Sequence, residues 1–174
     1  MERLIFLDES GATTQMTRSY ARATRGQRVK EATPQGHWQI LTMLAALTTR
    51  GLEAPMTIAE PTDGDIFLAY LEQILCPRLR PGQVVVMDNL SAHKVAGVRE
   101  QIEATGAVLV YLPPYSPDLN PIEQAWSKIK QVLRSLKART SETLESAVAH
   151  ALAAITPENA IAWFSHCGYG LQQL

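Results

Sequence analysis

Short apolar runs bounded by turn residues predict the β-strands of this chain. The first run ends at Asp8. The run that ends at Asp88 has no polar alternation, so we expect that strand to be buried on both faces. Residues 9–37 contain several Gly and Pro breakers and are expected to be irregular or to hold one short strand. The strands are expected at residues 3–8, 38–47, about 53–59, 83–88 and 107–112.

Apolar residues recur at helical spacing in most of the remaining segments. The helices are expected from 61–63 to about 75, near 94–105, and at about 121–138, 141–155 and 157–165. Three strands joined by short turns are thus followed by helix, strand, helix, strand and further helices. This order predicts an α/β fold whose mixed five-stranded sheet begins as an antiparallel meander, continues with parallel strands and is flanked by helices.

Length and composition narrow the class of protein. The 174 residues suit one domain, and a hydrophobic content of 46% with a mean hydropathy of −0.06 is ordinary for a globular chain. No apolar run approaches the roughly 20 residues that a membrane span needs, and the charged N-terminus is unlike a signal peptide. Cys76 and Cys167 form neither a disulfide framework nor a metal-ligand spacing. We therefore expect a cytoplasmic protein with no membrane partner.

Positive charge is clustered, although the net charge is only −1. Residues 18–30 and 124–139 contain no acid and together hold 10 of the 16 basic residues. Such clusters can form a local positive surface for nucleic acid, and they can equally be ordinary solvated faces.

Asp8 and Asp88 each follow a strongly apolar run. A turn residue that bonds its own backbone would explain either one alone. In an open α/β sheet, however, ligands bind at the carboxyl ends of the strands, and the two aspartates would be close if the first and fourth strands are neighbours. Like charges held together need a proton or a cation, and Mg²⁺ or Mn²⁺ prefers such oxygen ligands. The pair therefore suggests metal-dependent chemistry on phosphate esters.

Glu123 has two competing explanations. Asn120 is a good helix N-cap and Pro121 suits the first helical position, so completion of a capping box would by itself explain Glu123. The flank of the predicted helix suggests a functional role instead, because Glu123 shares that flank with three cations, beside a core stripe of apolar residues. The cations are Lys130, Arg134 and Lys137, and the stripe is Ile122, Trp126, Ile129, Leu133 and Leu136.

Two further candidates follow Asp88 in a predicted loop. His93 and Lys94 could contact phosphate or a metal-bound water there, although a surface loop would also place them there without any function.

Three segments together resemble the catalytic domain of Tc/mariner-type insertion-sequence transposases of the DDE superfamily. The segments are LIFLDESG (4–11), VVMDNLSAH (85–93) and LPPYSPDLNPIE (112–123). Between Asp88 and Glu123 lie 123 − 88 − 1 = 34 residues, a spacing typical of that superfamily, and the third segment is highly specific. The resemblance covers nearly the whole chain.

The resemblance implies a ribonuclease-H-like fold in which the first and fourth strands are adjacent. It implies that Asp8, Asp88 and Glu123 form an acidic triad that binds Mg²⁺ or Mn²⁺, with two ions expected. The family cuts DNA at transposon ends with water and then joins the freed 3′-hydroxyl to target DNA. The basic flank of the helix would hold the DNA backbone, and a second clamp is expected from Arg18, Arg22, Arg25 and Arg28.

Members of the family usually carry N-terminal helix-turn-helix modules that read the transposon ends. We expect residues 1–174 to be a single catalytic domain without that region. Related enzymes act as dimers on paired ends, so a second copy and a separate helix-turn-helix chain are the candidate protein partners. Two other functions stay open: a nuclease of the same fold that cuts RNA–DNA hybrids, and an inactive remnant that binds DNA or a partner chain.

Overall fold

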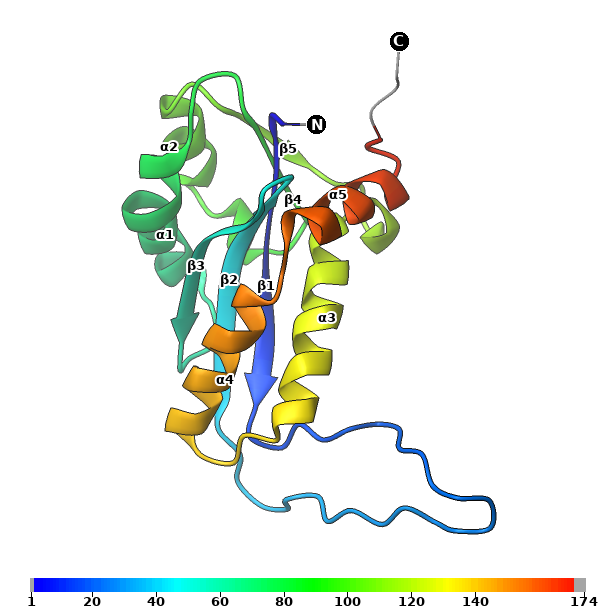
Figure 1. The fold of residues 1–174 in the computed structure, drawn as a ribbon. Helices are drawn as coiled ribbons and strands as arrows, with labels where there is room; N and C mark the ends of the chain where they lie inside the picture. Colours follow the sequence, from blue (N-terminus) through cyan, green and yellow to red (C-terminus); the bar gives the residue numbers. More distant parts are fainter. Residues whose placement is uncertain (1, 171–174) are drawn as a thin grey trace.

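A mixed five-stranded sheet with the order β3-β2-β1-β4-β5 forms the centre of the molecule (Figure 1). The structure is a computed structural model that describes residues 2–170. β1 pairs antiparallel with β2, and β2 with β3, whereas β1, β4 and β5 run parallel. The predicted meander followed by parallel strands is confirmed. The strands are β1 (Leu4–Thr13), β2 (Ile40–Thr48), β3 (Gly51–Ile58), β4 (Val84–Met87) and β5 (Val108–Tyr111).

Two strand boundaries differ from the prediction. β1 does not end at Asp8 but continues to Thr13, because residues 9–13 pair with β2 along its length. Asp8 therefore lies inside a strand, whereas Asp88 directly follows β4 as expected. β2 begins at Ile40, and the side chain of Trp38, predicted to be buried in this strand, is half-exposed.

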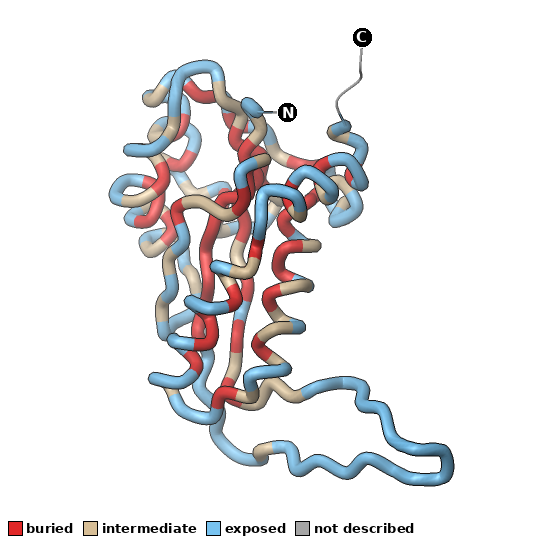
Figure 2. Tube along the Cα trace, in the orientation of Figure 1, coloured by how far each residue is buried: buried red, intermediate tan, exposed pale blue. Residues whose placement is uncertain are grey.

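Helices cover both faces of the sheet, and the strands between them are the most deeply buried part of the chain (Figure 2). α1, a π-helical turn and α2 pack on one face, and α3, α4 and α5 pack on the other. Their bounds are α1 (Gly64–Tyr70), the π-helical turn (Leu71–Leu75), α2 (Val98–Ala104), α3 (Pro121–Leu136), α4 (Ser141–Ala153) and α5 (Pro157–His166), with short 3₁₀ turns at Cys76–Arg78, Ala92–Lys94 and Pro117–Leu119. None of the helices within residues 2–170 is both long enough and apolar enough to cross a bilayer.

The helix predicted near 94–105 is divided in two. A 3₁₀ turn ends at Lys94, and α2 begins only at Val98. Between them Gly97 adopts a left-handed backbone with φ +98°, and a Cβ at this position would lie 3.3 Å from the Leu68 side chain. Because glycine tolerates this conformation, the chain can turn before α2 starts.

The apolar stripe of α3 is buried over most of its length. Ile122, Trp126, Ile129 and Leu133 are each at most 1% exposed. Leu136, predicted as the last member of the stripe, is instead 45% exposed. It occupies the final turn, directly before Lys137, which ends the helix in a left-handed conformation with φ 54°.

Residues 14–39 form a long loop that projects away from the body of the molecule near the last turn of α3 (Figure 1). Nearly all of this loop is exposed (Figure 2). Two basic residues that follow α3 hold its ends: Arg139 donates to the carbonyl oxygens of Thr14 and Met16, both at 3.0 Å, and Lys137 forms an ion pair with Glu31.

Candidate active site

Asp8 is a buried carboxylic acid in the middle of β1. Its side chain is 5% exposed and lies on the face of the sheet that α3 covers. One carboxyl oxygen accepts the Glu9 N–H at 2.8 Å, and the other accepts the indole N–H of Trp126 at 3.3 Å. Burial, opposed by the Glu9 N–H and reinforced by the charges of Glu123 and Asp88, raises the pKa of Asp8 to about 7.

Asp88 lies next to Asp8 on the neighbouring parallel strand. The β1–β4 register pairs Leu7 with Met87, so the next position on each strand is an aspartate. Neighbouring strands lie about 4.8 Å apart, and side chains at the same register point to the same face. The adjacent strands predicted from the resemblance are therefore confirmed, and with them the proximity of the two aspartates.

Hydrogen bonds keep Asp88 in its ionised form. Its Oδ1 accepts the N–H of His93 Nδ1 at 2.7 Å and the backbone N–H of Leu90 at 3.0 Å. Burial alone would raise the pKa of Asp88, but these donors outweigh it and leave the pKa below its usual value. The two neighbouring aspartates thus have pKa values shifted in opposite directions.

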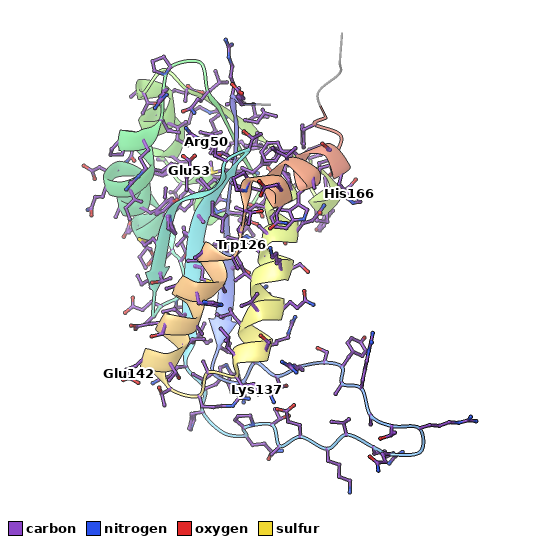
Figure 3. The ribbon with its side chains drawn as sticks, in the orientation of Figure 1. Arg50, Glu53, Trp126, Lys137, Glu142 and His166 are labelled. Carbon is purple, nitrogen blue, oxygen red and sulfur yellow. The ribbon has the colours of Figure 1, made fainter. Side chains whose placement is uncertain are left out.

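Glu123 lies in the first turn of α3, and its charge acts on Asp8. Trp126, three residues later on the buried side of the helix, donates its indole N–H to Asp8, so the hydrogen bond holds this part of α3 against β1. In Figure 3, Trp126 lies on the side of α3 that faces the sheet. Sequence reasoning assigned Trp126 only to the apolar stripe. The signal that could have identified this link is that a buried indole N–H needs an acceptor.

The structure does not support the capping explanation for Glu123. Asn120 is the N-cap of α3, but its side chain makes no capping hydrogen bond, and no capping box forms. The Glu123 side chain is exposed, and its negative charge helps to raise the pKa of Asp8. Helix capping therefore leaves the presence of this glutamate unexplained.

The three acids are grouped but are not assembled as a set of metal ligands. Within residues 2–170, no three His, Cys, Asp or Glu side chains are arranged to hold a metal ion. Protein N–H donors engage Asp8 and Asp88 instead. The chemistry of the donors nevertheless fits a hard divalent cation, since all three are carboxylates. Burial is the main cause of the raised pKa of Asp8, and the negative charges of Glu123 and Asp88 add to it.

An open groove of about 560 Å³ runs beside the acids, with Asp88 and Glu123 in its lining. Lys94 and residues 112–117 supply much of the remaining wall. Tyr115 lies at this groove with a fully exposed ring and a left-handed backbone, φ 57°. Such a backbone is strained for an aromatic residue, and residues of this kind concentrate at functional sites.

The predicted DNA-binding residues lie in two separate places. Lys130 and Arg134 are partly exposed on α3, and Lys94 is at the groove. Lys137 is at the far end of α3, where it pairs with Glu31 (Figure 3 labels Lys137). Exposed residues of the 14–39 loop include Arg18, Arg22, Arg25 and Arg28. Lys137 follows Glu123 by 14 positions (137 − 123), and at 1.5 Å per residue these span about 20 Å. The loop arginines are therefore not beside the acids.

Direct contact with DNA requires a side chain at the surface, and His93 is not at the surface. Its side chain is completely buried and bonds Asp88. As the structure places it, His93 is therefore not positioned to contact phosphate, in contrast to the exposed loop residue that the sequence suggested. The loop after β4 folds inward, which periodicity could not indicate.

Acids on adjacent parallel strands, a further acid on a helix packed across them and the strand order 3-2-1-4-5 define a ribonuclease-H-like fold with a candidate phosphoryl-transfer site. The family model described as DDE superfamily endonuclease matches residues 3–145. The chain belongs to this family. A search of curated proteins finds no sequence match.

Solved transposase structures share the fold. The pre-cleavage Mos1 transpososome matches with a TM-score of 0.76 and 16% identity, covering 96% of this chain and 52% of that chain. The Mos1 mariner paired-end complex with Mn matches with a TM-score of 0.74 and 17% identity, covering 96% and 52%. The catalytic domain of Mos1 mariner transposase matches at 0.67 and 14%, covering 96% and 76%. This chain thus spans about half the length of the first two Mos1 chains.

Proposed function

We propose that this chain is the catalytic domain of a DDE transposase, which cleaves DNA strands and transfers them with the help of divalent metal. Family membership supports the reaction class. The observation that carries the proposal is the side-by-side placement of Asp8 and Asp88, with Glu123 on a helix that is hydrogen-bonded to Asp8.

Asp8, Asp88 and Glu123 are the residues that would hold Mg²⁺ or Mn²⁺, with two ions proposed. Similar Mos1 paired-end complexes are described with Mn and with Mg. When bound, the ions would stabilise the attacking and leaving oxygens of an in-line displacement. The protein contributes by holding Asp8 between the Glu9 and Trp126 donors and by keeping Asp88 ionised.

DNA is the proposed substrate, as both transposon end and target. Lys94, Lys130 and Arg134 would hold the backbone near the acids, and the loop arginines would hold it beyond the last turn of α3, which is itself about 20 Å, or roughly six base pairs at 3.4 Å each, from Glu123. Contacts of this kind position DNA without reading its sequence. A second copy of the chain and a separate helix-turn-helix chain are the proposed protein partners.

The test is nicking of supercoiled plasmid DNA in Mg²⁺ and in Mn²⁺ by the wild-type chain and by Asp88→Asn. Loss of nicking with an unchanged circular dichroism spectrum is expected, because the variant loses an anionic oxygen ligand. Asp65→Asn, at an exposed position in the first turn of α1, is the matched control and should nick like wild type. Nicking by Asp88→Asn at the wild-type rate would contradict the assignment.

Three further measurements distinguish this function from the alternatives. A duplex with a free 3′-hydroxyl should be joined to plasmid by a transposase. Hydrolysis of RNA–DNA hybrids without joining would indicate the nuclease. DNA binding without metal uptake in calorimetry would indicate an inactive remnant.

A further inference from the structure

His93 is a polar side chain placed where the protein interior would normally hold an apolar one. It lies in the 3₁₀ turn Ala92–Lys94 and is 0% exposed. Nδ1 bonds Asp88 Oδ1 at 2.7 Å, while the buried Nε2 has no hydrogen-bond partner among the described residues. Buried polar atoms are nearly always paired, so leaving Nε2 unpaired has a cost that an apolar side chain would avoid.

Contacts that do not involve Asp88 hold the imidazole in place. The ring of Phe67, from α1, lies against it with centroids 4.5 Å apart and planes tilted by 35°. The hydroxyl of Tyr111, from β5, donates to the His93 carbonyl at 2.6 Å, and the His93 N–H donates to the Leu90 carbonyl at 3.1 Å. Two elements and the local turn therefore set the direction in which Nδ1 points.

The fixed N–H of His93 Nδ1 binds one oxygen of the Asp88 carboxylate. Oδ1 receives both the imidazole N–H and the Leu90 N–H, so rotation of the carboxylate would break two hydrogen bonds. Oδ2 accepts no hydrogen bond from the residues that the structure describes. It is the oxygen left available at the groove that Asp88 lines.

We propose that His93 is a positioning residue: it locks the Asp88 carboxylate so that one oxygen is always presented to the reaction site. His93 itself touches neither DNA nor the reacting atoms. This inference rests on the proposed function of Asp88, and it adds a role that neither the acidic triad nor the basic clusters supply. Groups that orient a ligand typically change metal affinity or activity by about 10–100-fold when they are removed.

Three substitutions separate positioning from simple packing. His93→Asn keeps an N–H donor bonded directly to Cγ, since the Asn Nδ2 takes the place of the His Nδ1. His93→Gln moves its donor one bond further out, and His93→Leu fills similar space without a donor. If His93 only fills space, Asn should be the poorest replacement, because it is smaller and polar. If it positions Asp88, Asn should be the best.

The experiment measures Mn²⁺ affinity by calorimetry, plasmid nicking and thermal unfolding for the wild-type chain and the three variants. We expect His93→Leu and His93→Gln to lose about 10–100-fold in Mn²⁺ affinity and nicking. We expect His93→Asn to stay within about threefold of wild type, although it unfolds at a lower temperature than His93→Leu. An Asn variant no better than Leu, or a Leu variant with wild-type affinity, would overturn the proposal.

A measurement without metal keeps this inference separate from the proposed function. In EDTA, proton NMR of the wild-type chain should show a slowly exchanging imidazole N–H that disappears in Asp88→Ala. Absence of that resonance would refute the positioning contact. If the resonance is present but wild type neither binds Mn²⁺ nor nicks DNA, the proposed function fails while the contact between His93 and Asp88 stands.

Discussion

Asp8 should limit the stability of the chain at neutral and alkaline pH. Its folded-state pKa of about 7 lies above the ordinary value of 3.8, because the carboxyl is buried and lies near two other acids. The folded state therefore binds the proton more tightly than the unfolded state. By linkage, the free energy of unfolding falls as the pH rises from about 4 to about 7 and is then constant with respect to this group.

The substitution Asp8→Asn tests this directly. The difference between 7 and 3.8 corresponds to about 4 kcal/mol at pH 8. The amide has only one acceptor oxygen, so it weakens one of the two hydrogen bonds from Glu9 and Trp126, at a cost of about 1 kcal/mol. We expect Asp8→Asn to be more stable than wild type by about 3 kcal/mol at pH 8 and by less than about 1 kcal/mol at pH 5.

Urea unfolding followed by tryptophan fluorescence in EDTA at the two pH values measures both differences. The exposed Asp65→Asn is the control and should change little at either pH. Excess MgCl₂ at pH 8 should stabilise wild type and not Asp8→Asn, since only a folded-state ligand set gains from the ion. The reasoning would be refuted if Asp8→Asn were no more stable than wild type at pH 8, or if its advantage did not depend on pH.

Three further outcomes follow from the same geometry. Trp126→Phe removes the N–H that bonds Asp8 at 3.3 Å. In urea titrations this variant should be destabilised by about 1 kcal/mol more at pH 8, where Asp8 is ionised, than at pH 5. An equal loss of stability at both pH values would show that only packing was removed. Lys130→Ala should weaken duplex binding equally for unrelated sequences and reduce the slope of log K against log salt by about 1 in fluorescence anisotropy; loss confined to one sequence would contradict a backbone contact. Tyr115→Asn suits the left-handed backbone, so thermal unfolding should not shift downward, while affinity for DNA with unpaired bases should fall about tenfold if the exposed ring stacks on a base; unchanged affinity would exclude that contact.

Several features of the fold could be read from local sequence patterns. Apolar runs of strand length followed by turns predicted the strands, and the parallel part of the sheet followed from the helices between them. The β1–β4 register then agreed with the expectation that Asp8 and Asp88 are neighbours. The strands and their directions depend on periodicity and chain connectivity, both of which are present in a linear sequence, whereas the adjacency of β1 and β4 was expected only from the family resemblance.

The site was predicted less completely, because its details depend on pairs of residues far apart in the chain. β1 continues beyond Asp8 because residues 9–13 pair with β2. The Asp8–Trp126 hydrogen bond joins residues 118 positions apart. His93 is buried because Phe67 and Tyr111 close around its turn. No local pattern records such contacts.

The succession of strands and helices along the chain, the positions of Asp8 and Asp88 after apolar runs and the helical flank of Glu123 were therefore set by local preferences of the chain. Tertiary packing decided the pKa shifts of Asp8 and Asp88, the burial of His93 and the separation of the arginine loop from the groove. The physical reason is that propensity and periodicity act between neighbours in sequence. Desolvation, charge coupling and hydrogen bonds between distant residues exist only once the sheet and α3 have come together.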